Sequence, residues 1–314
     1  SVLTPMTDLY LAQAAQCGVT DIVHRFPGED PQLIRETQQR IAGFGLRWSV
    51  IEGYLPIERI KLGEDDGRDL EAMKRLIRTM GQFEIPILCY NFMAGTDWIR
   101  TSIDAPERGG AKVTSFDLSQ LEHARIPGRE SYRDVPPESG MSADALWGNL
   151  ESFLTEMVPV AEDAGVTLAM HPDDPPLPSL LGNDRIMHDV AGFERLVSLV
   201  PSPANGIAFC QGTFSEMGVD IPATIRRLGP HIAYVHFRDV RGTAESFTET
   251  WQDSGQTDMV EAMRAYRDVG FSGPIRPDHV PQLIGEDDGA PGYTMLGRLY
   301  AYGYIRGLIQ ATAT

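Results

Sequence analysis

Four side chains that bind metal ions in proteins stand at the ends of successive β-rich runs. His171 ends the run TLAMH, Cys210 ends GIAFC, His236 ends AYVH, and Asp278 lies in PIRPDH. If these runs are consecutive parallel strands of a barrel, their carboxyl ends meet at one mouth and the four side chains converge there. A single histidine or cysteine at a strand end is more often a packed core residue, but packing does not readily explain four in succession. The spacing therefore predicts one metal centre.

The predicted ligand set contains two imidazoles, a thiolate and a carboxylate. Imidazole suits Zn, Fe and Ni, carboxylate suits Mn and Mg, and thiolate favours softer ions, so the mixture fits Mn(II), Fe(II) or Zn(II). Structural zinc sites usually take their ligands from closely spaced pairs, whereas these four are spread between positions 171 and 278. We therefore expect a catalytic centre that holds one divalent metal.

Two arginines lie close to predicted ligands. Arg238 and Arg276 are each two residues from a ligand, which places them on the same face of a strand. They could bind the carboxylate of a substrate in bidentate fashion. Alternatively, they could form ion pairs with Asp173, Asp174 or Asp239, and the sequence leaves both possibilities open.

Two residues near the last predicted ligand could transfer protons. His279 directly follows Asp278, and Tyr293 lies in a PGYT turn before the last predicted helix. A histidine exchanges protons near neutral pH with little tuning. Either residue alone could instead be structural, so the sequence predicts a pair of proton carriers without assigning acid and base.

The elements that must position these residues alternate along the chain. β-rich runs are expected at 20–24, 47–52, 85–91, 167–171, 206–210, 233–237 and 274–278. Amphipathic helices are expected at 8–16, 31–43, 68–81, 144–164, 190–200, 221–228, 259–269 and 293–310. This alternation is typical of a parallel sheet with crossover helices. We predict an α/β fold, a (β/α)8 TIM barrel that forms a single domain over residues 1–314, with a first strand at Ser1–Leu3 or incomplete.

One segment interrupts the alternation. Residues 92–141 follow the fourth predicted strand and are rich in Gly, Pro, Asp, Arg and Ser. A long connection in a compact domain is either functional or disordered, and a connection that follows a barrel strand lies at the mouth where active sites form. We expect a loop insertion that acts as a lid or faces the substrate; the alternative is a decorated surface loop.

The composition of the chain argues against nucleic acids and membranes as partners. The chain has 314 residues, a net charge of −17 and three cysteines. An acidic chain without a basic stripe repels nucleic acid. The sequence contains no run of about 18 apolar residues, so it predicts no membrane-spanning helix. Three scattered cysteines and the absence of a recognisable signal peptide favour a reducing, cytoplasmic location. A homo-oligomer is a general expectation that no particular feature of the sequence supports.

Several segments together resemble the mannonate dehydratases, which are related to the xylose isomerase-like TIM barrel superfamily. The segments are WSVIE (48–52), CYNFMAGTDWIRT (89–101), HPDDPP (171–176), RPDH (276–279) and PGYTMLGRLYAYGYIRG (291–307). The resemblance extends over nearly the whole chain, and the order and spacing of HPDDPP, RPDH and PGY are specific.

This resemblance implies a lyase of carbohydrate metabolism, in glucuronate catabolism, that eliminates water from D-mannonate to give 2-keto-3-deoxy-D-gluconate. It implies Mn(II) or Fe(II) as cofactor, held by the same four ligands, and it places proton transfer on His279 and Tyr293. The segment that faces the sugar acid would contain Asn91, Asp97, Trp98 and Arg100, and we also expect Asp173, Arg238 and Arg276 to contact substrate.

The sequence departs from the family pattern near the expected substrate. The family typically carries a histidine-bearing segment of FHE type, with another histidine shortly after it, where this chain has Thr248 and Gln252. Val280 stands where a glycine usually follows RPDH. These changes leave strict mannonate specificity open. The alternatives are a sugar isomerase, epimerase or related lyase on the same barrel, or a homologue that binds a metal or sugar acid without catalysis.

Overall fold

The structure, a computed structural model, describes residues 3, 5–126 and 140–313. Seven parallel strands form one curled central sheet in the order β1-β2-β3-β6-β9-β10-β13. The strands are β1 (Asp21–His24), β2 (Arg47–Glu52), β3 (Ile87–Tyr90), β6 (Thr167–Met170), β9 (Asn205–Cys210), β10 (Ile232–His236) and β13 (Ile275–Arg276). Each agrees with a predicted run to within two residues at either end.

Residues of the central strands alternate between two apolar surroundings, because successive side chains of a strand point to opposite faces. One set faces the helices and joins the large core, as Ile51 and Phe209 do. The other set faces the inside of the curl and forms a smaller cluster that includes Val50, Ala208 and Tyr234. Both faces of the sheet are therefore covered, as is usual for parallel strands.

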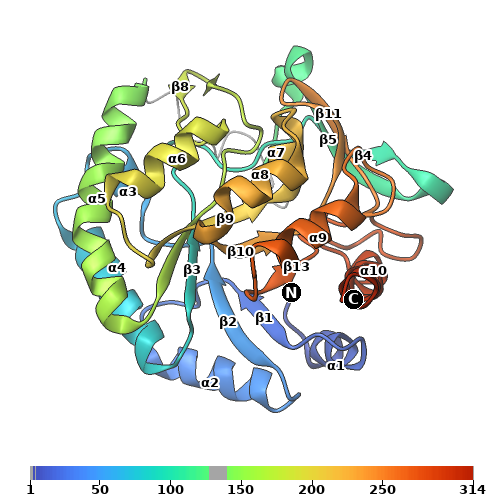
Figure 1. Cartoon of the computed structure of the whole chain (residues 1–314), viewed down its shortest axis with the longest axis horizontal. Coiled ribbons are helices and arrows are strands. Elements are labelled where there is room, and N and C mark those ends of the chain that lie inside the picture. The colour runs from blue at the N-terminus through green and yellow to red at the C-terminus, as the bar shows by residue number, and fades with distance from the viewer. Residues whose placement is uncertain (1–2, 4, 127–139, 314) are drawn as a thin grey trace.

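The helices lie on the outside of the curled sheet (Figure 1). They are α1 (Asp8–Gln16), α2 (Pro31–Ala42), α3 (Glu58–Lys61), α4 (Arg68–Gln82), α5 (Ala143–Ala164), α6 (Val190–Leu199), α7 (Gln211–Glu216), α8 (Ile221–Leu228), α9 (Met259–Asp268) and α10 (Met295–Ala311). Short 3-10 turns are η1 (Arg108–Gly110), η2 (Leu118–His123) and η4 (Gly229–His231). The eight predicted helices are present, and α3 and α7 are additions that the sequence pattern did not indicate.

The long helix α5 shows why these boundaries could be predicted. Ser142 caps its first turn, where the side-chain hydroxyl accepts a hydrogen bond from the backbone N–H of Ala145. Gly165 ends the helix in the left-handed region with φ of 67°, a conformation that costs glycine little. Both signals are local and can be read directly from the sequence.

The two ends of the chain approach each other where α10 packs near α1 (Figure 1). Of the first strand expected at Ser1–Leu3, Ser1 and Val2 lie outside the described residues, and Leu3 is buried without belonging to a strand. The observed architecture is an α/β fold with a curled parallel sheet of seven strands.

The expected loop at 92–141 contains regular structure in its described part. Strands β4 (Ser102–Pro106) and β5 (Lys112–Asp117) pair with the hairpin of β11 (Val240–Thr243) and β12 (Ser246–Glu249). These strands form a four-stranded antiparallel sheet in the order β11-β12-β5-β4, which we call the auxiliary sheet. It lies to one side of the central sheet (Figure 1). Residues 127–139 of the expected loop lie outside the described residues.

A second, minor hairpin joins β7 (Ser179–Leu180) to β8 (Asn183–Asp184). Among the described residues, no helix combines the length and the apolar character needed to cross a bilayer.

Candidate active site

The alternation of the central strands brings the predicted ligands to one end of the sheet. Tyr234 faces the inside of the curl, and two residues further along β10 His236 faces the same way. Cys210 is the last residue of β9, and His171 and Asp278 follow β6 and β13 closely. Because the four strands are parallel neighbours, their carboxyl ends share one edge.

The donor atoms of these four residues lie close together. His171 Nε2 and His236 Nδ1 are 3.1 Å apart, and the donors of both histidines and Cys210 lie within 4.8 Å of one another. Asp278 Oδ2 is 3.8 Å from Cys210 Sγ and 3.6 Å from His236 Nδ1. Donors that bind one ion at about 2.0–2.3 Å are themselves roughly 3–4.5 Å apart. The structure thus assembles the four side chains, and their binding of a metal stays a prediction.

The Cys210 thiol lies in surroundings that favour the thiolate. Burial raises its pKa, but the positive charge of Arg238 and hydrogen bonds with His171 and His236 outweigh burial, so that the pKa of Cys210 lies well below its ordinary value. Thr213 Oγ1 donates a hydrogen bond to Cys210 Sγ at 3.1 Å. A thiolate is the form that binds metal ions.

Asp278 is also held in its ionised form. Burial raises the pKa of this carboxyl, but His279, Arg276 and His236 together bring it well below its ordinary value. The backbone of Asp278 has φ of 44°, a left-handed conformation that costs a residue other than glycine about 1–3 kcal/mol. Such strain is concentrated at functional sites because the surrounding contacts must impose it.

The electrostatic surroundings of His236 favour a cation. Burial and Arg276 lower the pKa of this histidine, but the nearby carboxylates of Asp278 and Glu52 help to raise it well above the ordinary value. The same negative potential would attract a metal ion. Two imidazoles, a thiolate and a carboxylate in a buried, negatively charged site fit a divalent ion such as Mn(II), Fe(II) or Zn(II).

A second trio shares His236 but is less suited to a cation. Donor atoms of Glu52, Cys89 and His236 also lie within 4.8 Å of one another. Arg276 Nη2 lies 3.0 Å from Glu52 Oε1 but also pairs with Asp278, so this arginine does not favour one set over the other. Burial and the charge of Glu52 raise the pKa of Cys89 to about 11, which keeps the thiol protonated. The set that contains Cys210 is therefore the better candidate for an ion.

His279 and Tyr293 lie together beside the ligand cluster. Nε2 of His279 lies 3.2 Å from the hydroxyl oxygen of Tyr293 and 3.9 Å from Oδ1 of Asp278. The indole ring of Trp98 covers the His279 ring at a centroid distance of 4.2 Å. Burial and Asp278 raise the pKa of Tyr293. The structure therefore places the two predicted proton carriers within hydrogen-bond distance of each other.

Arg100 is enclosed by carboxylates. Its guanidinium donates to Asp174 Oδ1 at 2.6 Å and to Glu249 Oε1 at 2.6 Å, and the residue is 0% exposed. It also lies 5.1 Å from the ring centroid of Trp98. This geometry supports a role in holding Trp98 and Glu249 in place.

Arg238 and Arg276 are ion-paired as well. Arg238 contacts Glu216 Oε1 at 3.0 Å and Asp278 Oδ2 at 2.9 Å. Arg276 contacts Glu52 Oε1 at 3.0 Å and also pairs with Asp278. Both arginines are thus ion-paired, which was one of the two alternatives, but of the partners expected there only Asp174 is found, 3.0 Å from Arg238 Nη2.

The remaining predicted substrate residues differ in their surroundings. Asn91 Oδ1 accepts a hydrogen bond from Lys61 Nζ at 2.8 Å and is partly exposed. Asp97 Oδ1 accepts from the backbone N–H of Trp98 at 2.9 Å. Asp173 is 1% exposed, and its Oδ2 accepts from the backbone N–H of Met187 at 2.7 Å. Asn91 and Trp98 are thus better placed for a substrate than Asp173.

Sequence reasoning missed three charged residues at this end of the sheet. Arg25 Nη1 donates to the Glu52 backbone carbonyl at 3.2 Å, and its guanidinium carbon lies 5.9 Å from the ring centroid of Tyr293. Glu249 Oε1 lies 2.7 Å from His279 Nδ1. Strand alternation could have found Arg25 and Glu52, because each lies two residues beyond an inward-facing valine.

The three residues that depart from the family pattern, Thr248, Gln252 and Val280, have different surroundings. Gln252 is fully buried, and its Nε2 donates to the backbone carbonyl of His279 at 3.3 Å. Val280 is buried against α10, where an added Cβ at Gly297 would lie 3.0 Å from the Val280 Cβ. Thr248 lies on β12, opposite Ser115 of β5. Gln252 thus helps to hold the backbone of His279 in place.

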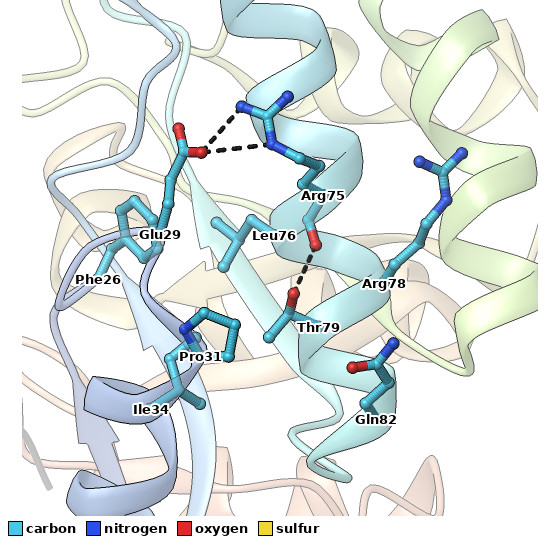
Figure 2. A pocket seen from close by; sticks show the side chains of 9 residues that line it. All are labelled: Phe26, Glu29, Pro31, Ile34, Arg75, Leu76, Arg78, Thr79 and Gln82. Atoms are coloured by element: carbon cyan, nitrogen blue, oxygen red, sulfur yellow. Dashed lines mark hydrogen bonds and ion pairs between the residues drawn. The ribbon is translucent and has the colours of Figure 1, made fainter.

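A separate pocket of about 280 Å³ lies between the β1–α2 connection and α4 (Figure 2). Phe26, Ile34 and Leu76 contribute apolar surface, and Arg75 Nη2 donates to Glu29 Oε2 at 2.8 Å. None of its lining residues belongs to the candidate site described above.

Comparison with known families gives a match over nearly all of the chain. The model of the D-mannonate dehydratase (UxuA) family matches residues 4–314. The chain is 33% identical over 304 residues to mannonate dehydratase 2 of Halalkalibacterium halodurans, covering 90% of this chain and 88% of the relative. It is 35% identical over 289 residues to the mannonate dehydratase of Oceanobacillus iheyensis, covering 86% and 82% of the two chains.

Solved structures agree with the sequence comparison. Mannonate dehydratase from Streptococcus suis serotype 2 superimposes with a TM-score of 0.88 at 32% identity, covering 98% of this chain and 91% of that one. A xylose isomerase domain protein from Planctomyces limnophilus superimposes with a TM-score of 0.60 at 13% identity, covering 96% and 92%. The second likeness concerns the fold alone and relates it to TIM-barrel-like proteins. The chain therefore belongs to the D-mannonate dehydratase family and is a hydro-lyase.

Proposed function

We propose that this chain converts D-mannonate to 2-keto-3-deoxy-D-gluconate and water at the site formed by the ligand cluster and the His279–Tyr293 pair. The observation that carries the proposal is their proximity. His279 Nε2 lies 3.2 Å from the Tyr293 hydroxyl and 3.9 Å from Asp278 Oδ1. A group that can move a proton therefore lies directly beside the carboxylate of a candidate ligand.

The reaction breaks the C2–H and C3–O bonds of the sugar acid, and the resulting enol becomes the 2-keto acid. Removing a proton next to a carboxylate is difficult because the negative charge that develops there is poorly stabilised. A divalent ion held by His171, Cys210, His236 and Asp278 would supply Lewis-acid stabilisation of that charge. We propose Mn(II) or Fe(II), with Zn(II) as the other ion that the donor set fits.

His279 and Tyr293 would move the two protons of the elimination. One proton leaves C2, and one joins the departing C3 hydroxyl so that water is released. Because Nε2 of His279 and the Tyr293 hydroxyl are within hydrogen-bond distance, a proton taken by one can be passed to the other. Trp98 covers the His279 ring and would keep water away from one face of it.

We propose that Arg25 binds the carboxylate of the substrate. Its side chain is 24% exposed, whereas Arg100, Arg238 and Arg276 are buried in ion pairs. Within the described part of the chain, Arg25 Nε is buried without a hydrogen-bond partner. The ion pair of Arg25 with Glu52 Oε1 is long, at 3.8 Å, so Arg25 can turn to an anion beside Tyr293 at a lower cost than the three enclosed arginines. The three enclosed arginines would then act by fixing carboxylates of the site.

Other features of the molecule are part of the same proposal. The TIM-barrel-like neighbours support a (β/α)8 barrel in one domain as the complete fold. A thiolate ligand such as Cys210 is best preserved in a reducing, cytoplasmic setting. A homo-oligomer remains a general expectation.

The function is tested by product analysis with metal-reconstituted protein. D-mannonate should lose one water and give the 2-keto-3-deoxy acid, whereas an isomerase or epimerase would conserve the substrate mass. Tyr293→Phe and His279→Ala should each reduce turnover by about 10²–10⁴-fold, the range typical of general acid–base groups, with metal content unchanged. Full activity in both variants would contradict the assignment of proton transfer, and an inactive native protein with bound metal would contradict the choice of substrate.

A further inference from the structure

Glu249 reaches the candidate active site from the auxiliary sheet. It is the last residue of β12, and its side chain is 5% exposed. His279 Nδ1 lies 2.7 Å from Glu249 Oε1, and the opposite ring nitrogen, Nε2, lies 3.2 Å from the Tyr293 hydroxyl. Glu249, His279 and Tyr293 thus form one hydrogen-bonded row.

We propose that Glu249 is a positioning residue that fixes the orientation and tautomer of His279 for proton transfer with Tyr293. This inference rests on the proposed function, because it assigns His279 and Tyr293 the roles given above. Glu249 itself contacts His279 Nδ1 and is separated from Tyr293 by the imidazole ring.

The ionised carboxylate of Glu249 determines which atom donates each hydrogen bond in this row. Burial raises the pKa of Glu249, but His279, Arg100 and Arg238 outweigh burial and bring it to about 2. An ionised carboxylate only accepts hydrogen bonds, so Nδ1 of His279 must carry the hydrogen. In the neutral ring Nε2 is then unprotonated and can accept the hydrogen of the Tyr293 hydroxyl.

The surroundings hold both partners in this arrangement. Arg100 Nη2 donates to Glu249 Oε1 at 2.6 Å, so the carboxylate cannot readily turn away. Trp98 covers the face of the His279 ring at 4.2 Å, and Gln252 donates to the His279 backbone carbonyl at 3.3 Å. The ring is therefore restrained at one edge, on one face and at its backbone.

Glu249→Gln tests the proposal with little change of shape. A glutamine can present its N–H group to Nδ1 and so stabilise the other tautomer. Where a buried carboxylate fixes a catalytic histidine, the corresponding amide variant costs up to about 10⁴-fold in kcat. We expect kcat for D-mannonate to fall by about 10²–10⁴-fold while KM and metal content stay within about threefold. Glu249→Asp, which restores the charge, should recover part of the loss.

Glu216→Gln is the matched control. Glu216 is a buried carboxyl that pairs with Arg238 at 3.0 Å, an arginine that also lies 3.7 Å from Glu249. Glutamine keeps the shape of this side chain and an oxygen that accepts from Arg238, and Asp174 and Asp278 still pair with this arginine. This variant should keep kcat within about threefold. An equal loss of kcat in both variants would show that the arginine network, rather than the contact with His279, is responsible, and would overturn the proposal.

A spectroscopic measurement separates this inference from the proposed function. Nitrogen-15 chemical shifts of histidine-labelled protein report the tautomer of each ring, and His279→Gln identifies the signals of His279. We expect a hydrogen on Nδ1 of His279 in the native protein and a shift of this population in Glu249→Gln. If the native protein does not convert D-mannonate, the proposed function fails, and these shifts still decide the role of Glu249. An unchanged tautomer with unchanged kcat would overturn the inference.

Discussion

Arg100, Arg238 and Arg276 lie among carboxylates with almost no exposed surface. Removing one partner of a buried ion pair leaves an uncompensated charge and costs about 3–5 kcal/mol. A substrate carboxylate that displaced one of these partners would incur a similar cost. For Arg25 this cost is smaller, because its side chain is partly exposed and its Nη1 lies 3.8 Å from Glu52 Oε1, too far for a hydrogen bond.

Arg25→Gln should therefore weaken substrate binding. A hydrogen bond to a charged group contributes about 1.5–3 kcal/mol, and each 1.4 kcal/mol corresponds to about a tenfold change in affinity. Steady-state kinetics should show KM for D-mannonate rising by about 10–100-fold, with a smaller change in kcat. Arg75→Gln, which removes an arginine from the separate pocket in Figure 2, is the control and should leave KM unchanged. An unchanged KM in Arg25→Gln would place the substrate carboxylate elsewhere.

At the scale of secondary structure, the auxiliary sheet connects the insertion to the chemistry. Phe247 of β12 pairs in register with Phe116 of β5, and their rings stack at a centroid distance of 5.9 Å. Two residues after Phe247 the strand ends at Glu249, which lies beside His279. The insertion thus contributes to the site by supporting the strand that carries Glu249.

The close contact between α4 and α5 gives a prediction about stability. A Cβ atom at Gly81 of α4 would lie 2.5 Å from the backbone oxygen of Ala164 in α5, so Gly81→Ala should force the helices apart. Overpacking of this kind costs about 1–3 kcal/mol. Gly148→Ala is the control: this glycine lies within α5 with open space around it, and alanine should stabilise the helix by about 0.5–1 kcal/mol. Urea unfolding of both variants measures the two changes, and equal signs would contradict this explanation.

At the scale of the whole molecule, the predicted ligands come from β6, β9, β10 and β13, which are consecutive in the central sheet. An ion held by all four would link residues from 171 to 278, and it could bind only where these strands are assembled. Ligand binding that is restricted to the folded state stabilises it by mass action.

Mn(II) should therefore raise the melting temperature, and a chelator should reverse the effect. At a free concentration of 100 times Kd, the stabilisation is about 2.7 kcal/mol. Cys210→Ser should lose most of the thermal shift because the thiolate is removed. Cys89→Ser should keep it, since burial and Glu52 raise the pKa of the Cys89 thiol to about 11 and keep it protonated. The opposite result would move the ion to Glu52, Cys89 and His236.

The alternation of strands and helices and the positions of the four candidate ligands could be predicted from the sequence alone. These features depend on local rules: caps such as Ser142 and Gly165 end helices, and the two-residue period of a strand places His236 on the same side as Tyr234. Parallel neighbours then bring the strand ends together without further information.

The surroundings of these ligands, by contrast, depend on contacts that form only in the folded chain. β5 and β12 are separated by more than a hundred residues and pair only when the chain is folded, so the meeting of Glu249 with His279 has no local signal. Likewise, an arginine on an inward face can bind a substrate or a carboxylate of the chain. For Arg25 and Arg238 that choice depends on which opposite charges the fold places beside them, because electrostatic energy depends on distance and burial rather than on order along the sequence.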